Sequence, residues 1–275
     1  MADPLTLMAV HAHPDDESSS TGGVLARYAA AGVRTVVVTC TNGELGDGPG
    51  GVKPGEAGHD EDAVVATRLA ELETACRILK VTNLELLGYR DSGMADWLFK
   101  DHDDAFCNVP IDESTGRLVT LFEKYRPAVV ITYDDQGGYN HPDHLQAHRV
   151  TVAAVERSDI PAKLYLSALR RRTFEKLRDK LAELGVEFPA PELDAETLAL
   201  MDAVEQRITT TVDTTAFVEQ KQRALAAHAS QVEESWFSRI PSEVFVDAFG
   251  TESFIRVRDT TGAPVPEDDL LAGIR

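Results

Sequence analysis

Short apolar runs and amphipathic stretches alternate along the chain as far as about residue 170. The short runs are rich in valine, isoleucine and threonine, which favour β-strands. Their nearly continuous apolar character indicates strands that are covered on both faces. Strands are expected at Leu5–His13, Thr35–Cys40, Leu84–Leu87, Ala128–Tyr133 and Lys163–Leu169.

Amphipathic patterns between these runs predict helices. The first pattern stops at Gly32, a typical residue just after a helix end, and the third must end before Pro127, because proline disfavours helix in the preceding residue. The expected helices cover Thr21–Ala31, Asp62–Leu79, Ser114–Lys124 and the residues that follow Pro142. This alternation predicts a doubly wound, Rossmann-like α/β fold, with a mainly parallel sheet and helices on both faces. Ligands of such sheets bind outside the carboxyl ends of the strands.

The pattern becomes less regular after about residue 170. Helices are expected at Lys176–Leu184, Glu196–Val204 and Phe217–Ser230, with the proline-containing stretch Phe188–Leu193 between the first two. Glu243–Ala248 and Ser253–Val257, joined through Gly250, are interpreted as a terminal pair of strands. We find no internal repeat and no linker between two cores. Residues 1–275 are therefore expected to form one domain, with a core at about 5–170 and a C-terminal α+β elaboration at about 171–275.

Polar residues are concentrated directly after the first and fourth predicted strands. The sequence HAHPDDE occupies positions 11–17, and a second His-Pro-Asp at positions 141–143 is followed by His144. Pro-Asp pairs often begin helices without any metal, so one such motif alone is weak. Two of them at the carboxyl ends of predicted parallel strands should face one another across the same edge of a sheet.

The two motifs together predict a metal site. A zinc hydrolase needs three nitrogen or oxygen ligands and one open position for water. His13, Asp16 and His144 can supply such a set, with Zn²⁺ as the expected ion and Fe²⁺ or another divalent ion as alternatives. Asp15 is then left beside the metal as a general base, and His141 as an acid for the leaving amine.

The neighbouring polar residues have different expected roles. Asp143 is placed to hydrogen-bond His141 and to favour its charged form. His11 is expected to be a packed histidine, and His148, four residues after His144, to be helical or to support a ligand. His59 and His102 lie in polar loops and are expected to be solvated.

Five segments in this order resemble the LmbE-like (PIG-L) zinc N-deacetylases. They are HAHPDDE, CTNGELGD, a helix with Arg68-x-x-Glu71, YRDSGM at 89–94 and TYDDQGGYNHPDH. The similarity runs from Leu5 to about His148 and recurs in Ala-His-Ala-Ser-Gln at 227–231. It is closest to the actinobacterial branch that includes the N-acetylglucosaminyl-inositol deacetylase of mycothiol biosynthesis and the mycothiol S-conjugate amidase.

The resemblance implies the same metal ligands, base and acid as the residues themselves suggest. It further implies that Tyr139 stabilises the oxyanion and that Arg68 and Asp91 contact a sugar. A structural salt bridge between Arg68 and Asp91 is the alternative interpretation of that last pair.

Several positions separate the branches of the family. The chain has Ser20 where the amidases have lysine, and Leu45 where they have arginine. Both features favour a deacetylase. Asp135-Gln136, Asn140 and the stretch Trp97–Asn108 match neither mycothiol enzyme well, which leaves a paralogue of natural-product metabolism as an alternative. We expect cleavage of the N-acyl, foremost N-acetyl, amide of an amino sugar or glycosylated metabolite. The alternative is an amidase acting on a thiol conjugate.

Composition narrows the possible partners. The 46 acidic and 27 basic side chains give a net charge of −19, which disfavours binding to nucleic acid or to an anionic membrane. The three cysteines form no CxxC pair, and the N-terminus has no basic region of the kind found in secretion signals. A cytoplasmic protein with a small-molecule substrate is expected.

Two other classes of protein were weighed against a hydrolase. Two histidines and a carboxylate also form the facial triad of non-haem Fe(II) oxygenases, but those use a His-x-Asp spacing on β-barrel scaffolds. Here the spacing is His-x-x-Asp in an α/β pattern. A non-catalytic binding module would be expected to have lost a ligand or the base, and the sequence retains all of them.

Overall fold

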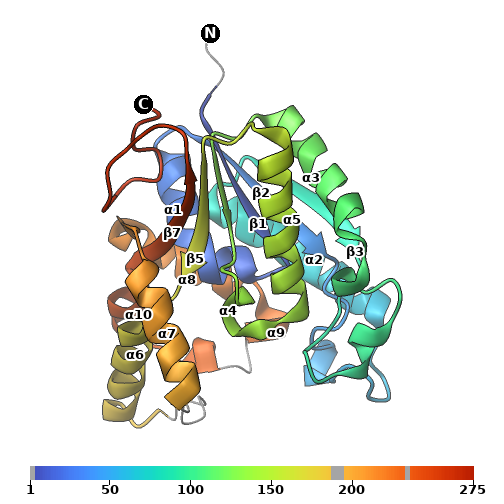
Figure 1. The fold of residues 1–275 in the computed structure, drawn as a ribbon. Coiled ribbons are helices and arrows are strands. Elements are labelled where there is room, and N and C mark those ends of the chain that lie inside the picture. The colour runs from blue at the N-terminus through green and yellow to red at the C-terminus, as the bar shows by residue number, and fades with distance from the viewer. Residues whose placement is uncertain (1–3, 187–194, 233–235) are drawn as a thin grey trace.

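The centre of the protein is a seven-stranded sheet with the order β3-β2-β1-β4-β5-β7-β6. The structure is a computed structural model that describes residues 4–186, 195–232 and 236–275 (Figure 1). All five strands predicted before residue 170 are confirmed, and they pair in parallel. The strands are β1 Thr6–His11, β2 Arg34–Thr41, β3 Asn83–Tyr89, β4 Val129–Thr132, β5 Lys163–Ala168, β6 Thr210–Asp213 and β7 Thr251–Asp259.

Two layers of helices cover the sheet, as a doubly wound fold requires (Figure 1). Successive side chains of β1 point to opposite faces, so that Leu7 and Ala9 join one apolar cluster and Met8 and Val10 join the other. The first cluster contains residues of α1 (Asp16–Ala30), α2 (Glu61–Leu79) and α8 (Val218–Ala226); the second contains residues of α3 (Ile111–Tyr125) and α5 (Pro142–Ser158).

Helix α1 begins five residues earlier than the apolar pattern predicts. Its first turn consists of polar residues, including Asp16 and Glu17, which the hydrophobic period does not register. Acidic residues are favourable there because they complement the positive end of the helix dipole. The helix ends as expected before Gly32, whose φ of 77° suits glycine.

The parallel pairing of β1 with β4 marks the topological switch point of the sheet. Strands β2 and β3 extend the sheet on one side of this pair, and β5 extends it on the other. The register aligns Ala9 with Ile131, so the segments that follow both strands emerge at the same edge. The predicted juxtaposition of the two His-Pro-Asp motifs is therefore confirmed.

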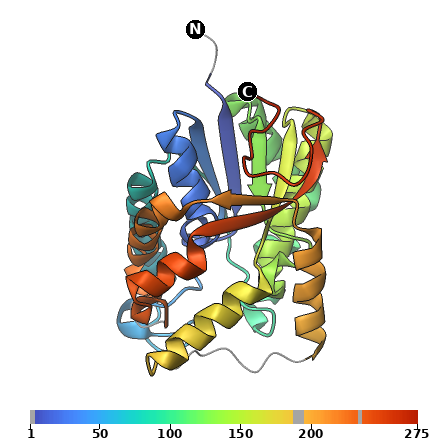
Figure 2. The same ribbon diagram turned by 90° about the vertical axis from the view of Figure 1, so that its left-hand side faces the viewer.

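The C-terminal part extends the sheet with antiparallel strands and adds helices at the end of the fold where the parallel strands terminate (Figure 2). Its other helices are α6 Arg171–Glu183, α7 Ala195–Arg207, α9 Ala229–Val232 and α10 Ser242–Phe249. A short helix α4 covers Gly137–Asn140, and 3₁₀ turns occur at Pro49–Gly51, Leu98–Asp101, Phe106–Asn108, Thr215–Phe217 and Trp236–Arg239. Within the described residues, no helix combines the length and apolarity needed to cross a membrane.

Two predictions for this part are wrong, and one strand was not predicted. Glu243–Ala248 is helical rather than extended, because Val244, Phe245 and Ala248 form a helical stripe buried in a third apolar cluster. Strand β6 was not predicted, since Thr210–Asp213 is short and largely polar. The helix expected at Phe217–Ser230 is interrupted between α8 and α9. The other predicted elements are confirmed, except that Phe188–Leu193 lies outside the described residues.

A buried charged cluster joins β5, β6 and β7 to the C-terminal segment. The carboxylate of Glu267 accepts hydrogen bonds from Lys163 Nζ at 2.5 Å, Tyr165 Oη at 2.8 Å, Thr210 Oγ1 at 2.9 Å and Arg256 Nη1 at 2.8 Å. Lys163 is fully buried. Burial alone would raise the pKa of Glu267, but the hydrogen bonds from Lys163, Tyr165 and Thr210 lower it below its usual range.

We predict that Lys163→Ala lowers the free energy of unfolding by about 1–3 kcal/mol at pH 7, because the buried carboxylate of Glu267 loses one of its two cationic partners and keeps Arg256. Urea denaturation measures this value. Lys176→Ala on the exposed face of α6 is the control and should change it by less than about 0.5 kcal/mol. The pKa of Glu267 is lower in the folded protein than in the unfolded chain. The contribution of this carboxylate to the free energy of unfolding is therefore present above its unfolded pKa of about 4.3, and it is lost as the pH falls through its folded pKa. Equal losses in both variants would contradict this account.

Candidate active site

The turn after β1 and the turn after β4 are tied together by Tyr133. The Tyr133 hydroxyl donates to Asp16 Oδ2 at 2.6 Å and accepts the backbone N–H of Ala12 at 2.7 Å. Its ring stacks on His144 with centroids 4.1 Å apart. Asp16 Oδ2 also accepts the backbone N–H of His13 at 2.8 Å, which folds the first turn onto the start of α1. One side chain thus orients groups from both motifs.

Three donor atoms converge at this point. His13 Nδ1 lies 3.3 Å from Asp16 Oδ2 and 3.3 Å from His144 Nε2, and the latter two atoms are 3.5 Å apart. Tetrahedral zinc with bonds of about 2.0–2.1 Å separates its ligands by about 3.3–3.4 Å. The triangle therefore has the size and chemistry of a zinc-type donor set.

The far nitrogens of both histidines are also engaged. His13 Nε2 lies 3.1 Å from Asp143 Oδ2, and His144 Nδ1 lies 3.0 Å from the carbonyl oxygen of Gly137. When these nitrogens carry the protons, the lone pairs of His13 Nδ1 and His144 Nε2 point into the triangle. Such outer contacts fix the ring orientation of metal-binding histidines.

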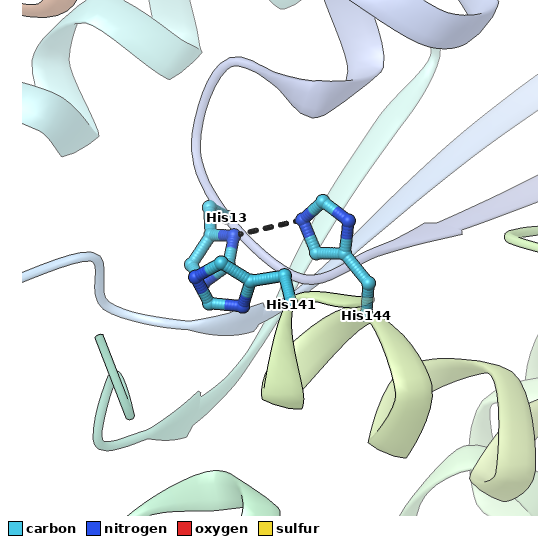
Figure 3. Close-up of side chains that lie close together, drawn as sticks. All are labelled: His13, His141 and His144. Atoms are coloured by element: carbon cyan, nitrogen blue, oxygen red, sulfur yellow. Dashed lines mark hydrogen bonds between the residues drawn. The ribbon is translucent and has the colours of Figure 1, made fainter. Parts of the chain in front are cut away.

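His141 lies next to this triangle and forms a second, overlapping donor set. Figure 3 shows the rings of His13, His141 and His144 gathered together, and one nitrogen of each lies within 4.8 Å of the others. The ring of His141 meets that of His13 edge-on, with centroids 4.5 Å apart. The described residues can therefore hold a metal in this region, and the set containing Asp16 has the spacings of 3.3–3.5 Å given above.

The hydrogen bond expected between Asp143 and His141 is present, but it comes from the backbone N–H of Asp143 and does not favour a charged His141. The buried carboxylate of Asp143 instead faces His13 and Ser92, accepting the backbone N–H of Ser92 at 2.9 Å and its hydroxyl as well. Its backbone N–H donates to His141 Nδ1 at 3.2 Å. Burial, with His13 and His144 nearby, lowers the pKa of His141 to about 3. Asp143 therefore orients a donor of the triangle and does not favour a charged His141.

Asp15 lies beside the triangle with a carboxylate that reaches water. Its side chain is 29% exposed, whereas that of Asp16 is 11% exposed. Asp15 Oδ2 lies 3.1 Å from Arg68 Nη2. Burial raises the pKa of Asp15 to about 6, while Arg68 opposes the rise. A carboxylate with a raised pKa is a suitable proton acceptor near neutral pH.

Arg68 and Asp91 have different hydrogen-bonding partners in the site. Arg68 donates to the carbonyl oxygens of Pro14 at 2.6 Å and Gly43 at 2.8 Å in addition to Asp15. Asp91 accepts the backbone N–H of Gly93 at 2.8 Å and lies 3.6 Å from His13 Nε2. The ion pair of Arg68 is thus with Asp15, and the alternative of a salt bridge to Asp91 does not hold.

These groups line one pocket of about 190 Å³. Tyr139 stands at its rim, 61% exposed, with its ring centroid 5.1 Å from that of His144. The apolar side chains of Leu45, Met94 and Trp97 also line the pocket. The lining residues are His13, Asp15, Asp16, Leu45, Arg68, Asp91, Gly93, Met94, Trp97, Tyr139, His141 and Gln231.

Gln231 clamps the loop that follows β2. Its amide accepts the backbone N–H of Asp47 at 3.0 Å and donates to the Asp47 carbonyl oxygen at 3.1 Å. A Cβ atom on Gly46 would lie 2.6 Å from Gln231 Oε1 and 2.7 Å from Arg68 Nη1, so a larger residue here would displace the ends of these two side chains. Gln231 belongs to the Ala-His-Ala-Ser-Gln segment at 227–231, in which the family similarity recurs. The sequence therefore contained a signal for this residue.

The remaining histidines have the following positions. His11 is buried and pairs with Thr21 Oγ1 at 2.8 Å, which confirms a packed histidine. His148 lies 2.9 Å from the Tyr133 carbonyl oxygen and thus supports the site indirectly. His102 is exposed, as expected, but His59 is half-buried and lies 2.9 Å from the Gly46 carbonyl oxygen.

A switch-point donor triangle on an open α/β sheet, with a carboxylate beside it, is typical of metal-dependent hydrolases. The model of the GlcNAc-PI de-N-acetylase (PIG-L) family matches residues 8–155, and the chain belongs to this family. The resemblance noted from the sequence is therefore confirmed.

Three known proteins illustrate the similarity. The 1D-myo-inositol 2-acetamido-2-deoxy-alpha-D-glucopyranoside deacetylase of Acidothermus cellulolyticus is 42% identical, covering 98% of this chain and 95% of its own. The mycothiol S-conjugate amidase of Streptomyces coelicolor is 36% identical, covering 100% and 99%. The structure of N,N'-diacetylchitobiose deacetylase from Pyrococcus horikoshii has a TM-score of 0.60 at 19% identity, covering 93% and 85%. The predicted enzyme class, an N-deacetylase or amidase, is confirmed by the family and these relatives.

We predict that Asp16→Ala weakens Zn²⁺ binding by more than the roughly 10–100-fold typical of residues that only support a ligand, because it removes one corner of the triangle. His141→Ala removes no corner of the triangle. It should therefore change the Zn²⁺ affinity by less than about 3-fold, which is below the range typical of residues that support a ligand. Competition with a chromophoric chelator measures both values. A larger loss in His141→Ala than in Asp16→Ala would assign the metal to the three histidines instead.

Proposed function

We propose that this protein is a zinc-dependent hydrolase that removes an N-acetyl group from an amino-sugar glycoside, releasing acetate and a free amine. The observation that carries the proposal is the donor triangle of His13, Asp16 and His144, with the Asp15 carboxylate beside it. The deacetylase relatives support the amide as the bond that is cleaved. A reaction of this kind requires neither O₂ nor an oxo-acid, unlike that of a facial-triad oxygenase.

The roles of the residues follow from their positions. Zinc, when held by the triangle, would polarise the acyl oxygen and make a water molecule more acidic. Asp15 takes a proton from the attacking water. His141 can present an Nε2–H to the leaving nitrogen as a hydrogen bond, because its Nδ1 accepts the Asp143 backbone N–H. The proton that the nitrogen gains as the C–N bond breaks is the one that Asp15 took from the water. The Tyr139 hydroxyl stands at the rim, where it can donate to the developing oxyanion.

An amino sugar suits the composition of the pocket. Asp91 lines the pocket as an acceptor for sugar hydroxyls. Arg68 lines it as well, but its guanidinium already donates to Pro14, Gly43 and Asp15, which leaves it a smaller share in such contacts. Trp97 and Met94 provide an apolar surface for the C–H face of a pyranose ring. The volume of about 190 Å³ suits a monosaccharide-sized group, since drug-sized ligands occupy about 300–1,000 Å³.

A deacetylase is favoured over an amidase of thiol conjugates by Leu45. This buried residue lines the pocket. The amidase branch of the family has arginine at the same position. An apolar side chain offers no partner to the additional polar groups of a conjugate.

We further propose that residues 1–275 form one domain that acts in the cytoplasm. Helix α8 supports the single domain, because some of its residues belong to the first apolar cluster, against the sheet, and others to the third apolar cluster, in the C-terminal part. The free thiols of Cys40, Cys76 and Cys107 support a reducing compartment.

We predict that Asp15→Asn keeps its fold and its metal but loses about 10²–10⁴-fold in kcat, because asparagine cannot accept the proton. Amine release from N-acetylglucosamine with added Zn²⁺, together with the zinc content of the purified variant, provides the measurement. Loss of zinc from the variant would mean that Asp15 is a ligand and that the roles of the two aspartates are reversed.

We predict that Asp91→Ala reduces kcat/KM for an N-acetylated sugar far more than for a simple acyl anilide, because only the sugar loses partnered hydroxyls. Steady-state kinetics on both substrates, with Asp96→Ala on the exposed neighbouring loop as the control variant, tests this. Equal losses on both substrates would assign Asp91 to support of His13, which lies 3.6 Å away.

A further inference from the structure

The most deeply buried charged pair near the active site joins two segments that are far apart in the sequence. Glu17 lies in the first turn of α1, and His228 lies in the break between α8 and α9. Both side chains are fully buried, and His228 Nε2 lies 2.8 Å from Glu17 Oε1. Burial of a carboxylate is costly unless it is paired and hydrogen-bonded, so the pair calls for an explanation.

The other oxygen of Glu17 leads directly to the proposed base. Glu17 Oε2 accepts the backbone N–H of Asp15 at 3.0 Å, while Oε1 also accepts the Ser18 hydroxyl at 2.5 Å. The Glu17 carboxylate therefore stands between His228 and the peptide group of Asp15. Removal of His228 would leave this carboxylate free to turn away from that N–H.

Asp15 needs such support because its backbone is strained. It has φ 120° and ψ −28°, a left-handed conformation that side-chain-bearing residues rarely adopt. Such a conformation is unfavourable and persists only when its surroundings hold it. Its carbonyl oxygen is held by the N–H groups of Ser18 and Ser19, and its carboxylate by Arg68. The bond to Glu17 holds its remaining backbone group.

We propose that His228 is a positioning residue for the general base: through Glu17, it holds the Asp15 backbone in the conformation that presents the carboxylate beside the metal triangle. This inference rests on the proposed function, because that function makes Asp15 the base. It assigns to the C-terminal elaboration a part in catalysis without any contact with substrate.

A purely structural role for the pair is the competing explanation, and the chain offers a matched control for it. Lys221 Nζ lies 2.7 Å from Glu252 Oε1, and both side chains are almost fully buried. Glu252 in turn accepts the backbone N–H groups of Gly23 and Val24. This second pair ties the same helices, α8 and α1, but does not contact Asp15.

The experiment compares His228→Ala, His228→Gln and Lys221→Ala. For each variant we would measure kcat and KM with N-acetylglucosamine, the Zn²⁺ affinity and Tm. His228→Ala should lower kcat by about 10–100-fold with KM and Zn²⁺ affinity unchanged, as displacement of a catalytic group by about 1 Å can do. His228→Gln should recover most of the loss, because its amide can still donate to Glu17. Lys221→Ala should lower Tm with kcat within about 2-fold of the wild type, since it acts on stability alone.

On the kinetic side, an unchanged kcat in His228→Ala, or equal losses of kcat in His228→Ala and Lys221→Ala, would overturn the proposal. If His228→Ala does not fold, Glu17→Ala takes its place under the same criteria. The crystallographic φ of Asp15 in the variant gives a readout that is independent of the reaction. A return to negative φ supports the proposal, and an unchanged φ near 120° overturns it. An active Asp15→Asn variant would refute the proposed function but would leave this structural readout valid.

Discussion

The parallel pairing of β1 with β4 is the constraint on which the active site depends. It brings the ends of two strands that are more than a hundred residues apart in the chain to one edge of the sheet, with Ala9 aligned to Ile131. Tyr133, the first residue after β4, can then reach across to Asp16 and Ala12. A shift of one residue in this register would turn Tyr133 to the opposite face and separate the donors of the triangle.

The first half of the fold was predictable because local and tertiary preferences agree there. Buried parallel strands such as Thr6–His11 consist of apolar residues on both faces, a signal that needs no knowledge of the neighbours. Ser242–Phe249 offers no such agreement. Its short apolar stretch suits a strand or a helix, and packing in the C-terminal cluster decides for the helix. In the break between α8 and α9, the buried His228 pairs with Glu17, and the helical pattern of the sequence contains no signal for this tertiary contact.

The site was predictable as a set of residues but not as a set of contacts. Neighbours in sequence suggested that Asp143 would serve His141, yet a residue in the first turn of a helix directs its side chain and its N–H to different partners. The carboxylate of Asp143 thus meets His13, and its N–H meets His141. In the same way, Arg68 was expected near a sugar, whereas its guanidinium is largely engaged by backbone carbonyl groups. Such choices depend on distances across the sheet edge, which sequence spacing does not contain.

The close packing around Gly46 has a consequence for how this enzyme can diversify. The loop after β2 lies against Arg68 and Gln231, where a methyl group on Gly46 would displace the ends of both side chains, and Gln231 holds the backbone N–H and carbonyl oxygen of Asp47. A longer or differently shaped loop would disturb the arginine that holds Asp15. New substrates would therefore have to be accommodated by exchange of side chains at Leu45, Met94 and Trp97, while the chain path beneath them stays the same. In this protein, the variable part of the pocket is its lining side chains, and the backbone that carries them is fixed.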